Sequence, residues 1–311
     1  MSLTRTTLTL HRPIQQRLEA ALQRLLQPQP STRDDFLRPH GEPALTAPGS
    51  VCWAVFKNPL VLFIGGVTAV VLELAEPRVR SGVWDHSSFR DQPLARLQRT
   101  GYAAMMTVYG PRSRAEAMIL RVGRMHERVR GRSPDGRAYC AADPELLDWV
   151  HATAWFGFLE AHHAYVRPLD AERRDRFYAE GVAVARRYGA LAAPASQAGL
   201  EALFDHWSSR LERSDIVFEF LRIARTMPLL AWPLRPLQGV LIKAAVETVP
   251  PSIRQRLGLD ARWNLSAWQR RLVCRAARVA DRLLLGTNPA VQACRRLGLP
   301  EDHLYGRQGP L

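Results

Sequence analysis

The stretch Arg96–Gly131, RLQRTGYAAMMTVYGPRSRAEAMILRVGRMHERVRG, places one histidine and one Arg/Thr pair on helix faces that are otherwise apolar. Ser113 followed by Glu116 is a capping-box pattern, which predicts a helix over about Arg114–Gly131. His126 falls on the apolar face of this helix, because it shares three- and four-residue spacing with Ala115, Met118, Ile119, Val122, Met125 and Val129. The sequence therefore predicts a buried His126.

The preceding segment, residues 93–109, predicts a second helix with the same design. Arg96 and Thr100 are four residues apart, so their side chains stack along the edge of its apolar face. Together the two helices offer an imidazole and an Arg/Thr pair to a shared interior. A single histidine on an apolar face is more often a hydrogen-bonded core residue than a ligand, and both interpretations of His126 stay open here.

Composition and charge restrict the class of protein. The chain has 311 residues, 47% of them hydrophobic, which is enough for one globular unit with a buried core. The net charge is +14, but only Lys57 and Lys243 are lysines, and the arginines are spread over the chain without interleaved stacking aromatics. This pattern argues against nucleic-acid binding.

The cysteines and the N-terminus point to a reducing compartment. No CxxC spacing occurs, which argues against structural zinc and against a disulfide scaffold formed by Cys52, Cys140, Cys274 and Cys294. Residues 1–13 contain no signal-peptide core, so we expect a cytoplasmic protein. The apolar run Leu60–Leu72 is thirteen uncharged residues long, too short to span a bilayer, and predicts a core helix.

Taken in order, the chain predicts a helix over residues 12–26, a Pro-rich irregular arm over 27–50, and one all-helical domain over 51–311. Asn58 and Pro59 start the apolar core helix. Gly65 and Gly66 inside it indicate that another helix or a flat ligand approaches closely. Residues 77–91 predict a turn-rich loop at the edge of the site.

The second half of the chain predicts helix after helix. Asp143 caps a helix that Pro168 ends, with His151 on its inner face as a second buried-histidine candidate. Since no alternating pattern is strong enough to predict a sheet, the fold class is all-α. Further helices are expected over about 170–189, 195–211, 215–226, 234–249, 265–285 and 289–297.

Signatures of serine hydrolases, P-loops and dinucleotide-binding folds are absent. One Glu-x-x-His occurs, Glu160 with His163, but a helical di-iron centre needs a second copy, so that alternative is weak. A buried histidine that faces an apolar, glycine-containing helix is also how a haem pocket is built. Spacing alone does not decide between these interpretations.

An ordered set of motifs gives a more specific indication. Residues 58–165 resemble the catalytic domain shared by bacterial latex-clearing rubber oxygenases and the fungal MpaB oxygenases. The pieces that carry the resemblance are LAEPRVRSGVWDHSSF, RLQRT, RMHERVRG and AYCAADPELLDWVHAT, in that order. Later helices, including LRPLQGVLIKAAVETVPPSIRQRLGL, fit the C-terminal half of that family, so the resemblance covers most of residues 50–260.

This resemblance implies a single multi-helix all-α domain with a buried, non-covalent haem b. His126 matches the proximal iron ligand, and Arg96 and Thr100 match polar residues of the haem-pocket helix. Arg99 occupies the place where rubber oxygenases can carry a distal lysine ligand. Because a guanidinium stays protonated, we expect an open or water-bound distal side.

The resemblance also implies lesser roles and one departure. Arg130, one turn after His126, could pair with a haem propionate. His86 and His151 match structural or pocket-lining positions. Glu76 stands where many relatives have a histidine, so that histidine's role does not transfer.

The leading hypothesis is a haem b-dependent oxygenase that activates O2, with iron on His126, and oxidises or cleaves a hydrophobic, unsaturated substrate. Arg96, Arg99 and Thr100 are the predicted catalytic residues, and His126, Arg130, Arg96 and His151 the predicted cofactor-binding residues. Two alternatives remain: a haem carrier or sensor without turnover, and a helical protein that uses its basic helix over 266–285 on an anionic membrane surface.

Overall fold

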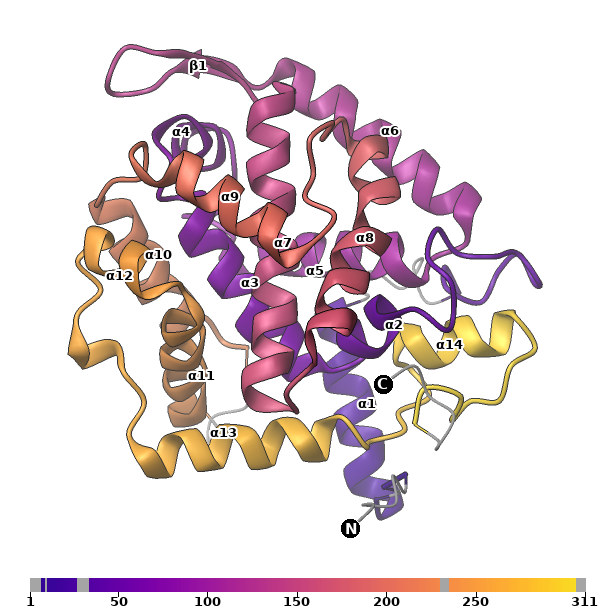
Figure 1. Cartoon of the computed structure of the whole chain (residues 1–311). Coiled ribbons are helices and arrows are strands. Elements are labelled where there is room, and N and C mark those ends of the chain that lie inside the picture. Colours follow the sequence, from indigo (N-terminus) through magenta and orange to yellow (C-terminus); the bar gives the residue numbers. More distant parts are fainter. Residues whose placement is uncertain (1–6, 9, 27–33, 230–234, 306–311) are drawn as a thin grey trace.

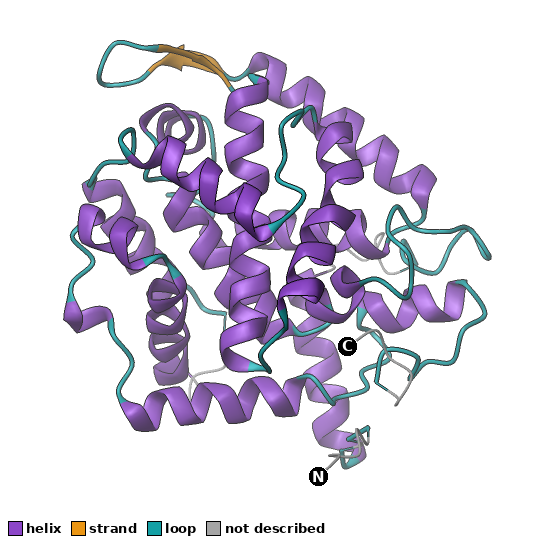
Figure 2. Cartoon of the chain, in the orientation of Figure 1, coloured by secondary structure: helices purple, strands orange, loops and turns teal. Residues whose placement is uncertain are grey.

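Helices make up nearly all of the regular structure (Figures 1 and 2). The computed structural model describes residues 7–8, 10–26, 34–229 and 235–305. Within these ranges the helices are α1 (Arg12–Leu26), α2 (Val51–Phe56), α3 (Pro59–Glu73), α4 (Pro77–Asp85), α5 (Pro93–Tyr109), α6 (Arg112–Arg128), α7 (Pro144–Tyr165), α8 (Ala171–Tyr188), α9 (Gln197–Ser208), α10 (Asp215–Thr226), α11 (Arg235–Thr248), α12 (Pro251–Leu257), a 3-10 turn (Ala261–Trp263), α13 (Ala267–Ala280) and α14 (Pro289–Arg296).

The predicted all-α class is confirmed, with one small addition. Strands β1 (Arg130–Arg132) and β2 (Ala138–Cys140) form an antiparallel hairpin in which Gly131 lies opposite Tyr139. The sequence predicted no sheet, because three residues are too few to show an alternating pattern. The hairpin projects from one end of the molecule, next to α4 (Figure 1).

Helices α3 and α7 cross in the centre of the protein with their backbones in contact (Figure 1). A Cβ atom added to Gly65 would lie 2.7 Å from the Phe158 Cα atom, and one added to Gly157 would lie 2.3 Å from the Gly65 carbonyl oxygen. Gly66, by contrast, has nothing within 4 Å of that position. The close approach that the glycines predicted is therefore made by another helix, at Gly65.

The starts of these two helices are the ones that the sequence predicted. The Asn58 side chain accepts hydrogen bonds from the backbone N–H groups of Leu60 (3.1 Å) and Val61 (3.3 Å). Asp143 accepts one from Glu145 N–H at 3.0 Å. A proline follows each cap, where its fixed φ suits the first helical position.

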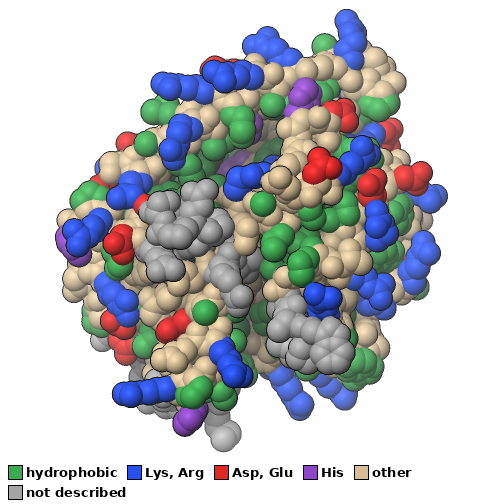
Figure 3. Space-filling view, turned by 180° about the vertical axis from the view of Figure 1, so that it is seen from behind, with side chains coloured by type: hydrophobic (Ala, Val, Ile, Leu, Met, Phe, Trp, Pro, Cys, Tyr) green, Lys and Arg blue, Asp and Glu red, His purple; other side chains and the backbone are tan. Residues whose placement is uncertain are grey.

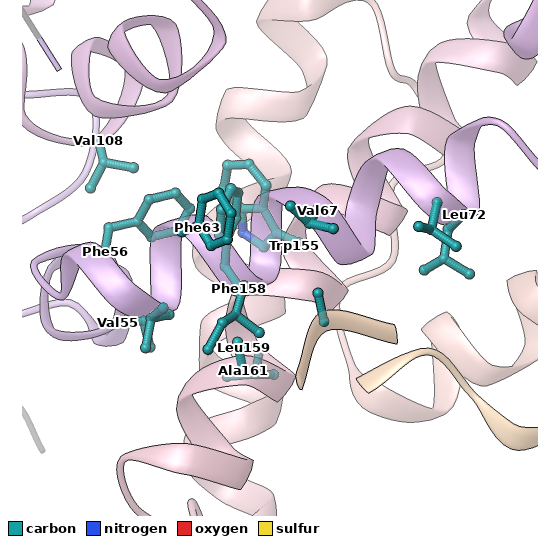
Figure 4. Packing of buried hydrophobic residues seen from close by; sticks show 14 of the residues in the cluster. Val55, Phe56, Phe63, Val67, Leu72, Val108, Trp155, Phe158, Leu159 and Ala161 are labelled. Atoms are coloured by element: carbon teal, nitrogen blue, oxygen red, sulfur yellow. The ribbon is translucent and has the colours of Figure 1, made fainter. Parts of the chain in front are cut away.

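Aromatic side chains fill the space beside the α3–α7 crossing. The Phe56 ring lies 4.6 Å from that of Phe158 and 5.7 Å from that of Trp155, centroid to centroid. Figure 4 shows these rings beside Phe63 and Val67 of α3. The short helix α2, which the sequence patterns did not predict, thus contributes to the centre of the core.

Helix α6 differs from its prediction at both ends. It starts at Arg112, and the Ser113/Glu116 capping box does not form, because the Ser113 hydroxyl donates instead to Glu42 (2.9 Å). Glu116 pairs with Arg187 of α8. Gly131 does not end the helix; it belongs to β1, where an added Cβ would meet the Tyr139 hydroxyl at 2.6 Å. The carboxylate of Glu42, from a distant part of the chain, thus takes the place of the predicted local cap.

The predicted loop over residues 77–91 is also wrong, because its first half is helix α4. The Glu76 side chain caps this helix by accepting from Val79 N–H at 2.8 Å, and Pro77 takes the first position. Glutamate is a less common cap than serine or aspartate, so the start signal was missed. The short helix α12 was missed as well.

The N-terminal arm is described only from residue 34, so the predicted course of residues 27–33 lies outside the described ranges. Phe36 of the arm is fully buried, and its carbonyl accepts from Arg296 of α14 at 2.7 Å. Among the described residues no single helix has the length and apolar character to cross a bilayer. Helices α3 and α4 have the necessary length and apolar composition only when they are taken together, and the chain bends by 114° between them.

Candidate active site

A cavity of about 1090 Å³ lies between α4, α5, α6 and the first turns of α7. Figure 3, seen from behind, shows the surface hollowed in its upper half, with histidine side chains inside the hollow. The volume is slightly above the range of about 300–1,000 Å³ that is usual for ligand pockets. Its wall combines apolar side chains with five arginines and two carboxylates.

Helix α6 borders this cavity along its whole length. The residues that line it recur at three- and four-residue spacing, from Arg114 through Met118 and Val122 to His126 and Val129. Ala115 and Ile119, beside this row, are buried in the protein as predicted. The predicted stripe was wrong for Met125, which is 56% exposed because the cavity takes the place of a packing partner.

His126 is half-buried and faces the cavity. Burial lowers the pKa of its imidazole, and the nearby positive charge of Arg96 lowers that pKa further. The ring is therefore neutral at pH 7, the form that binds a metal. Within the described ranges neither ring nitrogen has a hydrogen-bond partner in the protein, so both are available to a ligand.

Arg96 and Thr100 form the predicted pair on α5. An Arg96 guanidinium N–H donates to the Thr100 hydroxyl oxygen at 2.6 Å, and that hydroxyl donates to the Arg96 carbonyl at 3.0 Å. Both residues line the cavity together with His126. Thr100 thus holds the guanidinium in place while the remaining N–H groups of Arg96 stay free to donate to a ligand.

The cavity carries more positive than negative charge. Three of its five arginines are balanced by carboxylates: Arg78 by Glu76 and Glu145, Arg114 by Asp35, and Arg96 by the charge of Glu73. Arg99, which donates to the Ser88 hydroxyl at 2.7 Å, and Arg121 have no ion pair with any described residue. Two positive charges therefore remain uncompensated at the cavity wall.

Glu73, the last residue of α3, brings a carboxyl group to the same wall. Burial raises its pKa to about 7, against the opposing effect of Arg96. This carboxyl therefore takes up and releases a proton near neutral pH. Glu76 does not share this role, since it caps α4 and pairs with Arg78 at 2.9 Å.

Two predicted cofactor-binding residues lie outside the cavity lining. Arg130 is exposed in β1, and its Nε–H donates to the Glu127 carbonyl at 2.9 Å. His151 stacks on Trp155 with ring centroids 4.2 Å apart, and burial lowers its pKa to about 3. The wall of the cavity therefore contains neither of these two side chains.

The two residues of the weak di-iron alternative make other contacts in the structure. Glu160 pairs with Arg174, and the His163 Nδ1 atom accepts from Leu169 N–H at 3.1 Å. Across the described part of the chain, no group of three or more His, Cys, Asp or Glu side chains is arranged to hold a metal ion.

Comparison with known proteins identifies the family of this chain. Residues 53–282 match the sequence model of a family described as ER-bound oxygenase mpaB/B'/rubber oxygenase, catalytic domain. The chain belongs to this family. The uncharacterized proteins Mb2261 of Mycobacterium bovis and Rv2237 of Mycobacterium tuberculosis are each 30% identical to it over 229 residues, which is 69% of this chain and 87% of theirs. No solved structure is significantly similar to it.

In this mpaB/rubber oxygenase family member, sequence reasoning missed Tyr139 and Asp35 of the cavity lining, whereas the resemblance indicated a structural or pocket-lining position for His86. His86 follows α4 and Tyr139 lies in β2, with the His86 Nε2 atom 3.2 Å from the Tyr139 hydroxyl. Asp35 of the arm holds Arg114 and accepts from the Tyr102 hydroxyl at 2.5 Å. The motifs DHSS and AYC contain His86 and Tyr139, whereas no pattern indicated that Asp35 reaches the cavity.

The arrangement gives this oxygenase catalytic domain three chemical capacities. It offers one neutral imidazole to a metal centre, a guanidinium held by Thr100 to an electron-rich oxygen, and a carboxyl group that titrates near pH 7. Apolar side chains, among them Met106, Met118, Val122 and Val150, form much of the remaining wall.

Proposed function

We propose that this chain is a haem b-dependent oxygenase that activates O2 for the oxidation or oxidative cleavage of a hydrophobic, unsaturated substrate. The observation that carries the proposal is a neutral imidazole, His126, on the wall of a 1090 Å³ cavity that also carries two uncompensated arginines. Membership of an oxygenase family supports the reaction class.

The residues of the cavity fit a haem. A haem iron needs an axial ligand from the protein, and neither ring nitrogen of His126 has a competing hydrogen bond with a described residue. It also carries two propionates, and carboxylates pair strongly with guanidinium groups. Arg99 and Arg121 would hold these propionates, in place of Arg130, which lies outside the cavity lining. When bound, the haem supplies the chemistry of O2 activation.

The protein's own residues would then position the substrate and manage protons. Arg96, fixed by Thr100, donates to an electron-rich oxygen in the cavity. Glu73, beside Arg96, accepts or returns a proton near pH 7. The apolar part of the wall suits a hydrophobic substrate, such as one with a carbon–carbon double bond, and such a substrate would displace water from the cavity.

The test is the visible spectrum of the protein expressed with added haemin, compared with that of His126→Ala. We expect a Soret band in the parent that is lost or strongly shifted in His126→Ala. His206→Ala is the matched control, because His206 is exposed on α9, away from the cavity. A parent without a Soret band after haemin feeding would refute the proposal.

Oxygen uptake with a series of alkenes then separates an oxygenase from a haem carrier. Uptake that depends on both haem and alkene supports turnover. Tight haem binding without uptake for any alkene would leave only the carrier or sensor function.

The roles of Arg99 and Arg121 can be measured directly. We expect Arg99→Gln/Arg121→Gln to weaken haem binding at least about tenfold, since hydrogen bonds to charged groups contribute about 1.5–3 kcal/mol. The variant should also lose the parent's preference for haem over haem dimethyl ester. Arg124→Gln, an exposed α6 residue outside the cavity lining, is the control. An unchanged preference in the double variant would contradict this assignment.

A further inference from the structure

The outer face of α13, which the proposed function does not use, has an unusual composition. The helix AWQRRLVCRAARVA contains four arginines and no acidic residue. Trp268, Arg271, Arg275 and Val279 recur at three- and four-residue spacing and are all exposed, so they form one stripe along the helix. Val273 and Ala277 on the opposite side are buried against the protein. We call these four exposed residues the α13 stripe.

The contacts of α13 fix the direction in which the stripe faces. On its inner side the Ala277 carbonyl accepts from the Asn58 side chain at 2.9 Å, and Asp281 just beyond the helix pairs with Lys57. On its flanks Arg270 pairs with Glu247, and Arg278 donates to the Val166 carbonyl at 3.1 Å. The helix is therefore held against the protein with the stripe turned outward.

The arginines of the stripe differ from these flanking ones. Neither Arg271 nor Arg275 has an ion pair or hydrogen bond with a residue in the described ranges, whereas many other arginines of this chain are ion-paired. No acidic side chain exists on α13 to offset them. The stripe thus offers two unpaired guanidinium groups to an anionic partner.

Large apolar side chains flank these charges. Trp268 is 60% exposed at the start of the stripe, and Val279 is 46% exposed near its end. Helix α1 is attached beside the C-terminal end of α13, where Leu8 N–H donates to the Arg282 carbonyl at 2.9 Å. It adds exposed Ile14 (52%) to the same end of the molecule, opposite the hairpin (Figure 1).

We infer that the α13 stripe binds the surface of an anionic phospholipid membrane. A helix that lies in the interfacial plane needs cationic side chains for the headgroup phosphates and an aromatic or aliphatic side chain for the acyl boundary. The stripe has both, and tryptophan favours this interface because its ring is apolar and its N–H is polar. A nucleic acid backbone would engage the arginines but would gain little from Val279 or Ile14.

The experiment is co-sedimentation of the full chain with vesicles of phosphatidylcholine alone and of equal parts phosphatidylcholine and phosphatidylglycerol. We expect binding to the anionic vesicles only, with loss at high salt as the screening length falls from about 8 Å to about 3 Å. Arg271→Gln/Arg275→Gln should lower the partition coefficient about 30-fold, from about 1 kcal/mol per arginine.

Controls separate this interaction from general basicity and from nucleic acid. Arg128→Gln/Arg132→Gln removes the same charge at the hairpin end of the molecule and should leave vesicle binding within about twofold of the parent. Trp268→Ala should weaken vesicle binding but not binding to a short DNA duplex. Equal losses in both arginine variants would overturn the inference. So would a duplex that binds more tightly than the vesicles and through Arg271 and Arg275.

Discussion

Two helix pairs in this protein show opposite solutions to packing. Helices α3 and α7 touch backbone to backbone at Gly65 and Gly157, leaving no room for a Cβ atom between them. Helices α5 and α6 follow each other in the chain with only two residues between them, yet they border a cavity of about 1090 Å³. The first pair leaves no space between its backbones, whereas the second leaves room for a ligand.

The difference lies in the side chains at each interface. The α3–α7 crossing consists of glycines and large apolar residues, so burial of nonpolar surface holds it. The α5 and α6 faces carry Arg96, Thr100, Arg121 and His126, whose polar atoms would be unpaired in a closed interface. A cavity between packed helices thus follows from polar side chains on a predicted apolar stripe.

The largest effect should come from adding a side-chain atom at the contact between α3 and α7. Gly65→Ala should lower the free energy of unfolding by about 1–3 kcal/mol, because the new Cβ overlaps the Phe158 backbone. Gly66→Ala, one residue away with open space, should raise it by up to about 1 kcal/mol through helix propensity. Urea unfolding of both variants measures the contrast. Equal stabilities would contradict the backbone contact.

On the cavity side, Glu73 should make stability fall as pH rises. The unfolded carboxyl ionises near its ordinary pKa of 4.5, whereas the folded one keeps its proton to about 7. The unfolded state therefore binds fewer protons in this window, and the folded state loses up to about 3 kcal/mol by pH 8. Glu73→Gln should be more stable than the parent at pH 8 and similar to it at pH 4.5. Glu127→Gln, exposed on α6, should show no such pH-dependent gain.

On the packed side, His151 should give the opposite pH dependence. The unfolded imidazole takes up a proton below its ordinary pKa of 6.5, whereas the folded one, stacked on Trp155, does so only near pH 3. Stability should therefore fall as pH falls below 6.5, by about 2 kcal/mol between pH 7 and pH 5. His151→Phe keeps the ring stacking and should lose this acid sensitivity in thermal unfolding, whereas His206→Phe should retain it.

The smallest effect concerns the start of α6. A capping box would couple Ser113 to Glu116, but in the structure Ser113 binds Glu42 and Glu116 binds Arg187. A double-mutant cycle with Ser113→Ala and Glu116→Ala should therefore be additive within about 0.5 kcal/mol. Each substitution alone should cost at most about 1.5 kcal/mol. A larger coupling would mean that the local cap forms after all.

The helices were predictable from sequence where local signals set them. Asn58 and Asp143 cap their helices as expected, and the apolar periodicity located α5 through to α14 with α12 missed. Errors occurred where a distant residue intervened. Glu42 replaces the local cap of α6, and Tyr139 takes the space that makes Gly131 a strand residue.

The candidate site was predictable in part for the same reason. His126, Arg96, Arg99 and Thr100 follow from helix periodicity and motif order, and the structure places all four on one cavity. The resemblance suggested Arg130 as a propionate partner, but the helix ends at Arg128 and Arg130 lies in β1, outside the cavity lining. Arg121 also lines the cavity, although it lies five residues before His126 and so does not share the helical spacing that points to His126.

The Gly65–Gly157 contact joins residues 92 positions apart (157 − 65). A ribosome that adds about 5–20 residues per second needs about 5–18 seconds to travel between them. During that interval α3, nine of whose residues are buried in the finished protein, has no α7 to pack against. The nascent chain therefore exposes the apolar α3 segment for seconds, so α3 is a segment to which a chaperone would bind during synthesis.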